Sequence, residues 1–337
     1  MLIFTVKRVL SSVLVLLVTS VVVFVFCAWQ FDPLKRYQLS QPPKTPAFFA
    51  AQRHALGLDH SLLDRYWLWL IHLVRFDFSS WMFIRFNFGT DIENAPIATQ
   101  LASRLEVTAR MILAAIVLAA LIAVIAGVVS GVRRDKPIDI GITVLTFMLL
   151  ALPTFWFAAV LKEAAISLNN AAGSRVFYTT GDSSFGIQSY ASTPTIWRDE
   201  LLHLILPTVS LALLTTSGWI RYQRAATIEV LDADYLRLAR AKGVRWPRVI
   251  WRHGLRNALI PLITIMAIDV GALFGGAIIT ERVYAWHGMG EFLSTALTNE
   301  DTNSVVGWVM VSAAFVVLFN LLADLLYAAL DPRVRLA

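Results

Sequence analysis

MILAAIVLAALIAVIAGVVSG, residues 111–131, carries no charged side chain and contains only one polar group, a serine near its end. A helix needs about 20 predominantly apolar residues to cross a hydrocarbon core about 30 Å thick. In lipid, only helices and closed barrels satisfy every backbone hydrogen-bonding group, and a continuous apolar run is typical of a helix. The stretch therefore predicts a membrane-spanning helix.

The sequence on either side of this stretch repeats the pattern. The short basic turn VRRDKP, residues 132–137, leads directly into another apolar run, so we expect two antiparallel spans. Of all residues, 57% are hydrophobic and 15% are charged, whereas a soluble domain carries about 25% charge. We predict an all-α membrane protein with about six transmembrane helices. The other five are expected at Val9–Trp29, Ile138–Leu161, Leu201–Ile220, Leu259–Ile279 and Val305–Leu326.

The first apolar run follows Lys7 and Arg8 and is longer than the apolar part of a secretory signal, which spans about 7 to 15 residues. It ends in Phe26 and Trp29, where a signal peptidase requires small side chains. We therefore expect a retained helix.

Lysine and arginine are distributed unequally between the two ends of the predicted spans. The N-terminus, 132–137, 221–256 and the C-terminal tail hold 16 of the 29 basic residues. Short cytoplasmic loops are enriched in these residues, so both termini are expected in the cytoplasm. This distribution also accounts for the net charge of +6 without a nucleic-acid partner.

The predicted organisation has three parts. An N-terminal segment with the first span covers residues 1–29, and an extracytoplasmic subdomain covers 30–100. The core at 101–337 carries the other spans and a cytoplasmic segment at 221–256. Within the spans, Pro153 and Pro207 predict kinks.

Few residues in the chain suggest chemistry. Asp269 and Asp324 are carboxylates in predicted spans, where a charge requires a partner or a wet cavity, and we consider both as pore or relay residues. The single cysteine, Cys27, has no partner for a disulfide. The histidines show no pair with zinc-protease spacing, so we expect isolated loop histidines and no metal site; they are His54, His60, His72, His203, His253 and His287.

The cytoplasmic segment is patterned as a helix, a tight turn and a helix. Gly243 is placed to end the first helix in the left-handed conformation, and Pro247 suits the first turn of the second. Helical spacing predicts one apolar face formed by Ile228, Leu231, Tyr235 and Leu238, and one cationic stripe formed by Arg245, Arg248, Arg252 and Arg256. A basic loop resting on anionic lipid is the alternative interpretation.

The order of residues in this segment adds a resemblance. DYLRLARAKG, residues 234–243, and RHGLRNALIP, residues 252–261, resemble the EAA loop of binding-protein-dependent ABC importer permeases in the form of the dipeptide and oligopeptide branch. Ala239-Arg240-Ala241 stands where Glu-Ala-Ala gives the loop its name, and His287 replaces the usual proline. Shorter matches along the chain are LGLD (56–59), NFG (87–89), LPTFW (152–156), GG (275–276) and TE (280–281).

The resemblance implies a type I ABC importer arrangement in which this chain forms half of the pore and has no catalytic activity. The expected partners are a homologous second permease, two ATPase subunits or domains, an extracytoplasmic solute-binding protein and the lipid bilayer. The chain is expected to bind no cofactor, with ATP and Mg on the ATPases, and to lie in a bacterial inner membrane. The implied ATPase-coupling residues are Asp234, Tyr235, Ala239, Arg240, Ala241, Lys242 and Gly243.

Several alternatives stay open. Similar permeases import nickel, glutathione or oligosaccharides in place of peptides. An ion-coupled secondary transporter would use Asp269 or Asp324 as its relay, but it needs no amphipathic cytoplasmic loop. An intramembrane enzyme would need paired catalytic groups within the spans, and the sequence shows none there. No G-x-x-x-x-G-K-[ST] motif occurs, so we expect ATP to be hydrolysed elsewhere.

Overall fold

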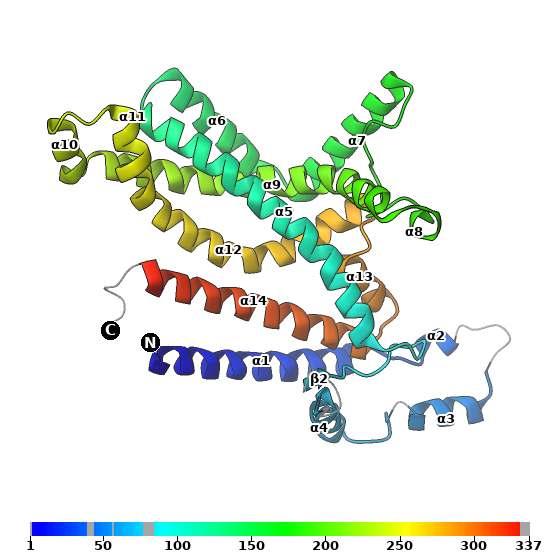
Figure 1. Ribbon diagram of the computed structural model, residues 1–337. Coiled ribbons are helices and arrows are strands. Elements are labelled where there is room, and N and C mark those ends of the chain that lie inside the picture. Colours follow the sequence, from blue (N-terminus) through cyan, green and yellow to red (C-terminus); the bar gives the residue numbers. More distant parts are fainter. Residues whose placement is uncertain (1, 39–43, 56, 77–83, 331–337) are drawn as a thin grey trace. The chain divides into compact units, whose positions relative to one another are not determined.

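The computed structural model describes residues 2–38, 44–55, 57–76 and 84–330, which are nearly all helical (Figure 1). The basic residues of the C-terminal tail, Arg333 and Arg335, lie outside the described residues. Two compact units emerge from the backbone contacts: unit 1 is Met1–Glu106 with Gly288–Val317, and unit 2 is Val107–His287 with Leu318–Ala337. The division predicted at residues 29 and 100 separates membrane from extramembrane segments, and it stays a prediction.

Unit 1 contains the first span and most of the segment that follows it. Its elements are α1 (Leu2–Gln30), α2 (Lys35–Gln38), α3 (Pro46–Ala55), α4 (Leu62–Leu73), β1 (Val74–Phe76), β2 (Ile84–Phe86), α13 (Met289–Thr298), and the starts of α5 (Ile97–Val132) and α14 (Thr302–Leu330). β1 and β2 pair antiparallel, with Val74 opposite Phe86.

The core of unit 1 joins the C-terminal half of α1 to α4. The rings of Phe24 and Tyr66 meet edge to face at 5.5 Å, and the hydroxyls of Ser20 and Tyr66 lie 2.9 Å apart. Just beyond α1, Lys35 Nζ donates to Glu300 Oε1 at 2.5 Å, and this contact lowers the pKa of Glu300. The loop before α14 is thus tied to the end of α1.

Unit 2 contains the remaining elements: the rest of α5 and α14, α6 (Pro137–Ala151), α7 (Thr154–Ala172), α8 (Ile187–Tyr190), α9 (Thr193–Leu231), α10 (Asp234–Ala241), α11 (Trp246–Val249), a π-helical turn at Ile250–Gly254, and α12 (Leu255–Tyr284). α9 and α12 form the most extensive helix pair, and both also pack against α7. Figure 1 shows α10 and α11 at one end of this unit and α7 and α8 at the other.

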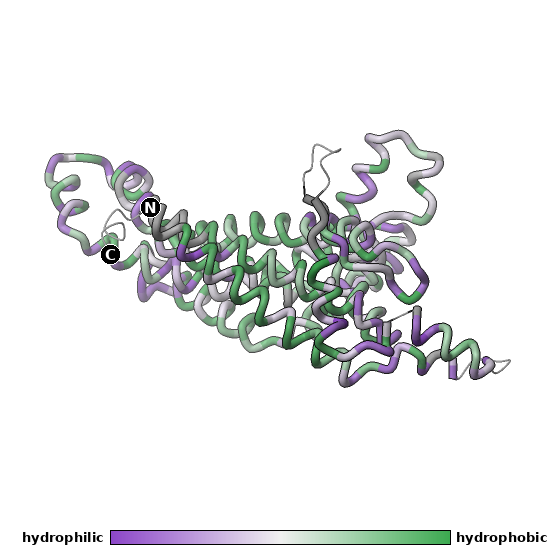
Figure 2. Tube along the Cα trace, turned by 90° about the horizontal axis from the view of Figure 1, so that it is seen from below, coloured by the Kyte–Doolittle hydropathy of each residue, from purple (hydrophilic) through white to green (hydrophobic). Residues whose placement is uncertain are grey.

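Five described helices are long and apolar enough to span a membrane, and a sixth span follows if α6 and α7 count as one. In Figure 2 the middles of the long helices are mostly apolar, while polar residues gather at their ends and in the connecting segments. The prediction of about six spans is confirmed. The helices extend beyond the predicted bounds, because polar residues continue them past the apolar runs.

The prediction of one helix over 138–161 is wrong. α6 and α7 meet at Leu152–Pro153 with a bend of 105°, since both residues are extended rather than helical. Proline disfavours the helical conformation of the residue before it, which accounts for the break. α7 also continues to Ala172, beyond the predicted end of the span at Leu161.

Candidate functional site

The segment predicted to couple to an ATPase forms a hairpin, which we call the coupling hairpin and define as residues 232–249. Its first helix, α10, ends in a Schellman motif: the Gly243 N–H donates to Arg240 O at 2.9 Å and the Val244 N–H to Ala239 O at 3.3 Å. Gly243 has φ +79°. The predicted left-handed end of this helix is therefore confirmed.

The second helix of the hairpin is short. α11 begins after Arg245 with Pro247 in its first turn, as predicted, and continues through the π-helical turn into α12. Arg245, Arg248, Arg252 and Arg256 are all exposed. The π-turn interrupts the α-helical periodicity that the prediction of a single cationic stripe assumed.

The coupling hairpin folds back onto the start of α12. Leu236 of α10 is 1% exposed, and its Cδ1 lies 3.7 Å from the position a Cβ would take on Gly254 of the π-turn. Asn257 Nδ2 donates to Tyr235 Oη at 2.8 Å. These contacts hold α10 against the helix that leads back into the membrane.

The predicted apolar face of this segment is wrong. α9 ends at Leu231 and α10 begins at Asp234, so the four residues do not share one helix, and Tyr235 and Leu238 are exposed. Leu236 is the buried residue instead. Nothing in the local sequence distinguished Leu236, because this side chain is buried only where the π-helical turn at Gly254 packs against α10.

The other predicted coupling residues lie at the surface of α10. The Arg240 guanidinium sits over the Trp246 ring at 4.6 Å, a cation–π contact that closes the hairpin. Asp234 and Lys242 are exposed, with Asp234 3.8 Å from Arg237. Ala241 is exposed and Ala239 is half-buried. Their role in coupling stays a prediction.

An ion pair between the half-buried Arg224 and the buried Asp139 supports the end of α9 that carries the hairpin. Arg224 donates from Nε and Nη2 to the two oxygens of Asp139 at 2.7 and 2.8 Å. Asp139 also accepts from the Ser130 hydroxyl and, at 2.9 Å, from the Asp135 N–H. The pair thus fastens the α5–α6 turn and α6 to α9, close to the point where the hairpin leaves.

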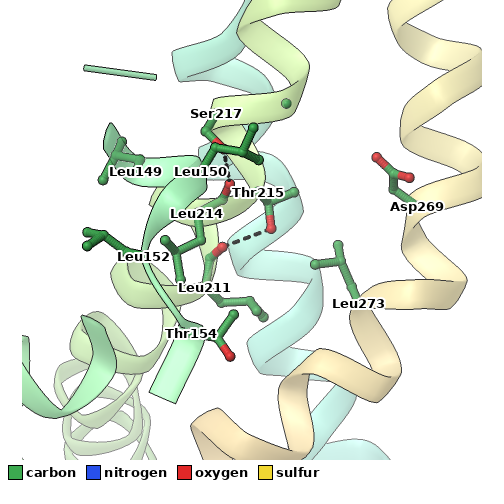
Figure 3. Close-up of a pocket in the computed structure, with 11 residues that line it drawn as sticks. Leu149, Leu150, Leu152, Thr154, Leu211, Leu214, Thr215, Ser217, Asp269 and Leu273 are labelled. Atoms are coloured by element: carbon green, nitrogen blue, oxygen red, sulfur yellow. Dashed lines mark hydrogen bonds between the residues drawn. The ribbon is translucent and has the colours of Figure 1, made fainter. Parts of the chain in front are cut away.

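The second candidate site is a pocket of about 350 Å³ inside unit 2, which we call the mid-span pocket (Figure 3). It lies where the α6–α7 break faces α9 and α12. Most of its lining is leucine, and Asp269 is its only charged residue. The lining consists of Leu149, Leu150, Leu152, Thr154, Leu211, Leu214, Thr215, Ser217, Gly218, Asp269 and Leu273.

Asp269 extends from the middle of α12 toward α9 in Figure 3. Its Oδ2 accepts a hydrogen bond from Trp219 Nε1 on α9 at 2.7 Å. Asp324 lies on α14 in the part whose side chains are not described, so its predicted pore role is untested. Of the two acidic candidates, the structure describes the surroundings of Asp269 alone.

The end of unit 2 opposite the hairpin is closed by polar contacts. His287 Nδ1 lies 2.6 Å from Asp182 Oδ1, so the residue that replaces the family's usual proline joins the 173–186 segment to the end of α12. Lys162 Nζ reaches Val283 O at 2.7 Å, and Arg110 reaches Glu200 at 2.5 Å.

The prediction of isolated loop histidines is wrong for His54, His72 and His253, which lie in α3, α4 and the π-helical turn, and most clearly for His203. This residue lies on α9, is 1% exposed, and packs against the Tyr178 ring in a tilted arrangement, with the ring centroids 4.4 Å apart. Its Nδ1 is 2.9 Å from Asp199 O, while Asp199 accepts from the Ser184 N–H and hydroxyl. The sequence placed His203 correctly in a span but did not predict its contacts with Tyr178 and Asp199.

The chain matches two families of known proteins. Residues 123–336 match the family described as "Binding-protein-dependent transport system inner membrane component", and residues 1–111 match its N-terminal counterpart. The oligopeptide transport system permease protein OppB of Mycobacterium bovis is 37% identical over 334 residues, covering 98% of both chains. The glutathione transport system permease protein GsiC of Salmonella choleraesuis is 30% identical over 337 residues, covering 99% of both.

A solved structure shares the fold. A chain of the methionine ABC transporter MetNI in inward-facing conformations has a TM-score of 0.54 at 14% identity. The match covers 69% of the present chain and 97% of the MetNI chain. At this identity the similarity concerns the fold alone.

Proposed function

The chain belongs to the family of binding-protein-dependent transport system inner membrane components, and we propose that it forms half of the translocation pore of an ATP-driven importer of oligopeptides or dipeptides. The observation that carries the peptide assignment is the full-length similarity to an oligopeptide permease. The described spans and the coupling hairpin between α9 and α12 are in keeping with this role.

In this proposal the coupling hairpin is the lever that receives work from an ATPase. The Schellman turn, the Leu236 contact and the Tyr235–Asn257 hydrogen bond make it stiff, and it is continuous with α9 and α12. Displacing the hairpin would therefore move both helices. Because these two helices line the mid-span pocket, the displacement would reach the solute path.

The partners follow from the same proposal. ATP and Mg would bind to two partner ATPase subunits, because the chain itself lacks a phosphate-binding loop. A related second permease would complete the pore, and an extracytoplasmic binding protein would deliver the solute. We place both termini in the cytoplasm of a bacterial inner membrane, because the N-terminal and C-terminal segments are basic like the 132–137 turn and the hairpin, which share one end of unit 2 (Figure 1).

Glutathione is the second candidate solute, since a permease named for it is 30% identical over the full length. Glutathione is itself a small peptide, so both assignments require a path for a charged, flexible solute. Uptake of labelled oligopeptides and glutathione by the complete complex would distinguish them.

The lever is tested at Gly243. At φ +79° a valine is strained by about 1–2 kcal/mol, which corresponds to roughly a tenfold change in an equilibrium. Gly243→Val should therefore lower peptide-stimulated ATP hydrolysis of the reconstituted complex by about tenfold. Gly243→Asn should retain most of it, since asparagine tolerates this conformation.

Gly173 provides the matched control. It also has positive φ, +61°, with nothing within 4 Å of an added Cβ, but it caps α7 at the far end of unit 2. Gly173→Val should leave the stimulation intact. Equal loss in both variants, or normal coupling in Gly243→Val, would contradict the lever.

A further inference from the structure

We propose that the mid-span pocket is a cation-binding site on the solute path, in which Asp269 takes an ammonium group of the imported peptide. This inference rests on the proposed function and deepens it. It names the chemistry by which the membrane-embedded part of the chain recognises what it moves.

The first argument is the electrostatic cost of Asp269. The residue lies in a helix segment that qualifies as a membrane span, where an ionised carboxylate is expensive. Among the described residues of unit 2, no lysine or arginine lies within ion-pair distance of it. Trp219 donates one neutral hydrogen bond, which orients the carboxylate but leaves its charge uncompensated. A bound cation would supply the missing charge.

The second argument is that each polar group in the pocket lining can accept a hydrogen bond, and that most of them have no donor left to offer. Trp219 occupies Oδ2 of Asp269, and no described residue donates to Oδ1. The Thr215 and Ser217 hydroxyls donate to Leu211 O and Leu214 O at 2.8 and 2.6 Å, so only their lone pairs remain for a ligand, while the Thr154 hydroxyl can accept as well as donate. An ammonium group has three donors and no acceptor, which matches this set.

The third argument is the location. Asp269 lies near the middle of α12, and Leu150, Leu152 and Thr154 at the α6–α7 break line the pocket. Transporter sites are commonly built near the middle of the bilayer beside discontinuous helices, because the break leaves room between packed spans. The surrounding leucines would accept apolar side chains, so the fitting solute combines one cationic group with apolar groups.

The test uses the assembled membrane complex of this chain, its second permease and its ATPases, purified without the binding protein. Equilibrium dialysis would measure binding of three labelled peptides: trileucine, N-acetyl-trileucine, and N-acetyl-Leu-Lys-Leu. The wild-type complex should bind trileucine at least about tenfold more tightly than N-acetyl-trileucine, since a hydrogen bond to a charged group is worth this much. If only trileucine is favoured, the ammonium is the peptide's N-terminus; if N-acetyl-Leu-Lys-Leu is favoured as well, a side chain also serves.

The variants separate charge from structure. Asp269→Asn keeps an oxygen to accept from Trp219 but removes the charge, and it should bind all three peptides with equal, weak affinity. Asp269→Glu should recover part of the preference. Trp219→Phe frees the carboxylate to turn and should reduce the preference without abolishing it.

Three outcomes would overturn the inference: a wild-type complex with no preference for the cationic peptides, an unaltered preference in Asp269→Asn, or loss of the second permease from that variant's complex. The last would mean that a basic residue of the partner neutralises Asp269. Uptake by the complete transporter is a separate readout. A wild-type transporter that hydrolyses ATP but imports no peptide would defeat the proposed function, whatever the pocket binds.

Discussion

At the scale of single residues, the ion pair between Arg224 and Asp139 holds the end of α9 that leads into the coupling hairpin. Asp139 is 2% exposed and accepts hydrogen bonds from Ser130, Asp135 and Arg224. Burying a carboxylate requires that its acceptor sites be filled. Arg224 also carries the compensating charge, so the two residues act as a unit that anchors α9.

Removing the guanidinium alone should therefore be costly. Arg224→Met leaves Asp139 charged and buried, and we expect the free energy of unfolding to fall by about 3 kcal/mol. Arg224→Met combined with Asp139→Asn should be less destabilising than the sum of the single changes. Denaturant titration of the purified protein in detergent measures each value.

Arg221→Met serves as the control on the same helix. Its guanidinium is exposed and lies 5.0 Å over the Phe147 ring, a contact worth about 0.5–1 kcal/mol. Similar losses of unfolding free energy for Arg221→Met and Arg224→Met would show that the Arg224–Asp139 ion pair is worth no more than an exposed cation–π contact.

At the scale of elements, α5 packs closely against the C-terminal part of α9 and helps to fix its position. A Cβ on Gly127 would lie 2.6 Å from Gln223 Cβ, and one on Gly131 would lie 2.7 Å from Thr227 Cβ. The two glycines are four residues apart and therefore share one face of α5. Small residues at such spacing let membrane helices pack with their backbones near each other.

Filling this face should separate the helices. Gly127→Val is expected to lower the free energy of unfolding by about 1–3 kcal/mol through overpacking. Gly141→Val, on α6, is the matched control, because nothing lies within 4 Å of an added Cβ there. Thermal unfolding of both variants in the same detergent checks the difference, and equal melting temperatures would refute the close-packing argument.

At the scale of the whole molecule, the orientation in the membrane is open to a direct test. Cys27 is buried and is the only cysteine, so Cys27→Ser provides a thiol-free background. Arg134, Lys242 and Phe185 are exposed, the first two in segments expected in the cytoplasm and the third between α7 and α8, at the end of unit 2 opposite the hairpin.

Single cysteines at these three positions should react differently with a membrane-impermeant maleimide. On intact spheroplasts, only Phe185→Cys is expected to be labelled, while Arg134→Cys and Lys242→Cys should react after permeabilisation. The basic segments predict this pattern through the positive-inside rule. Labelling of Lys242→Cys from outside would reverse the topology and remove the hairpin from reach of an ATPase.

The sequence by itself was sufficient for the spans, the left-handed end at Gly243 and the family, because apolar runs, basic loops and turn residues act locally along the chain. It failed at Leu152–Pro153, where a predicted kink is a 105° break, and at Leu236 and His203, whose burial depends on distant segments. Asp269 was a candidate from its position alone, but its partner Trp219 lies 50 residues away. Only the tertiary structure decided these contacts, because packing between helices that are far apart in the sequence produces no recognisable pattern in the sequence of either helix.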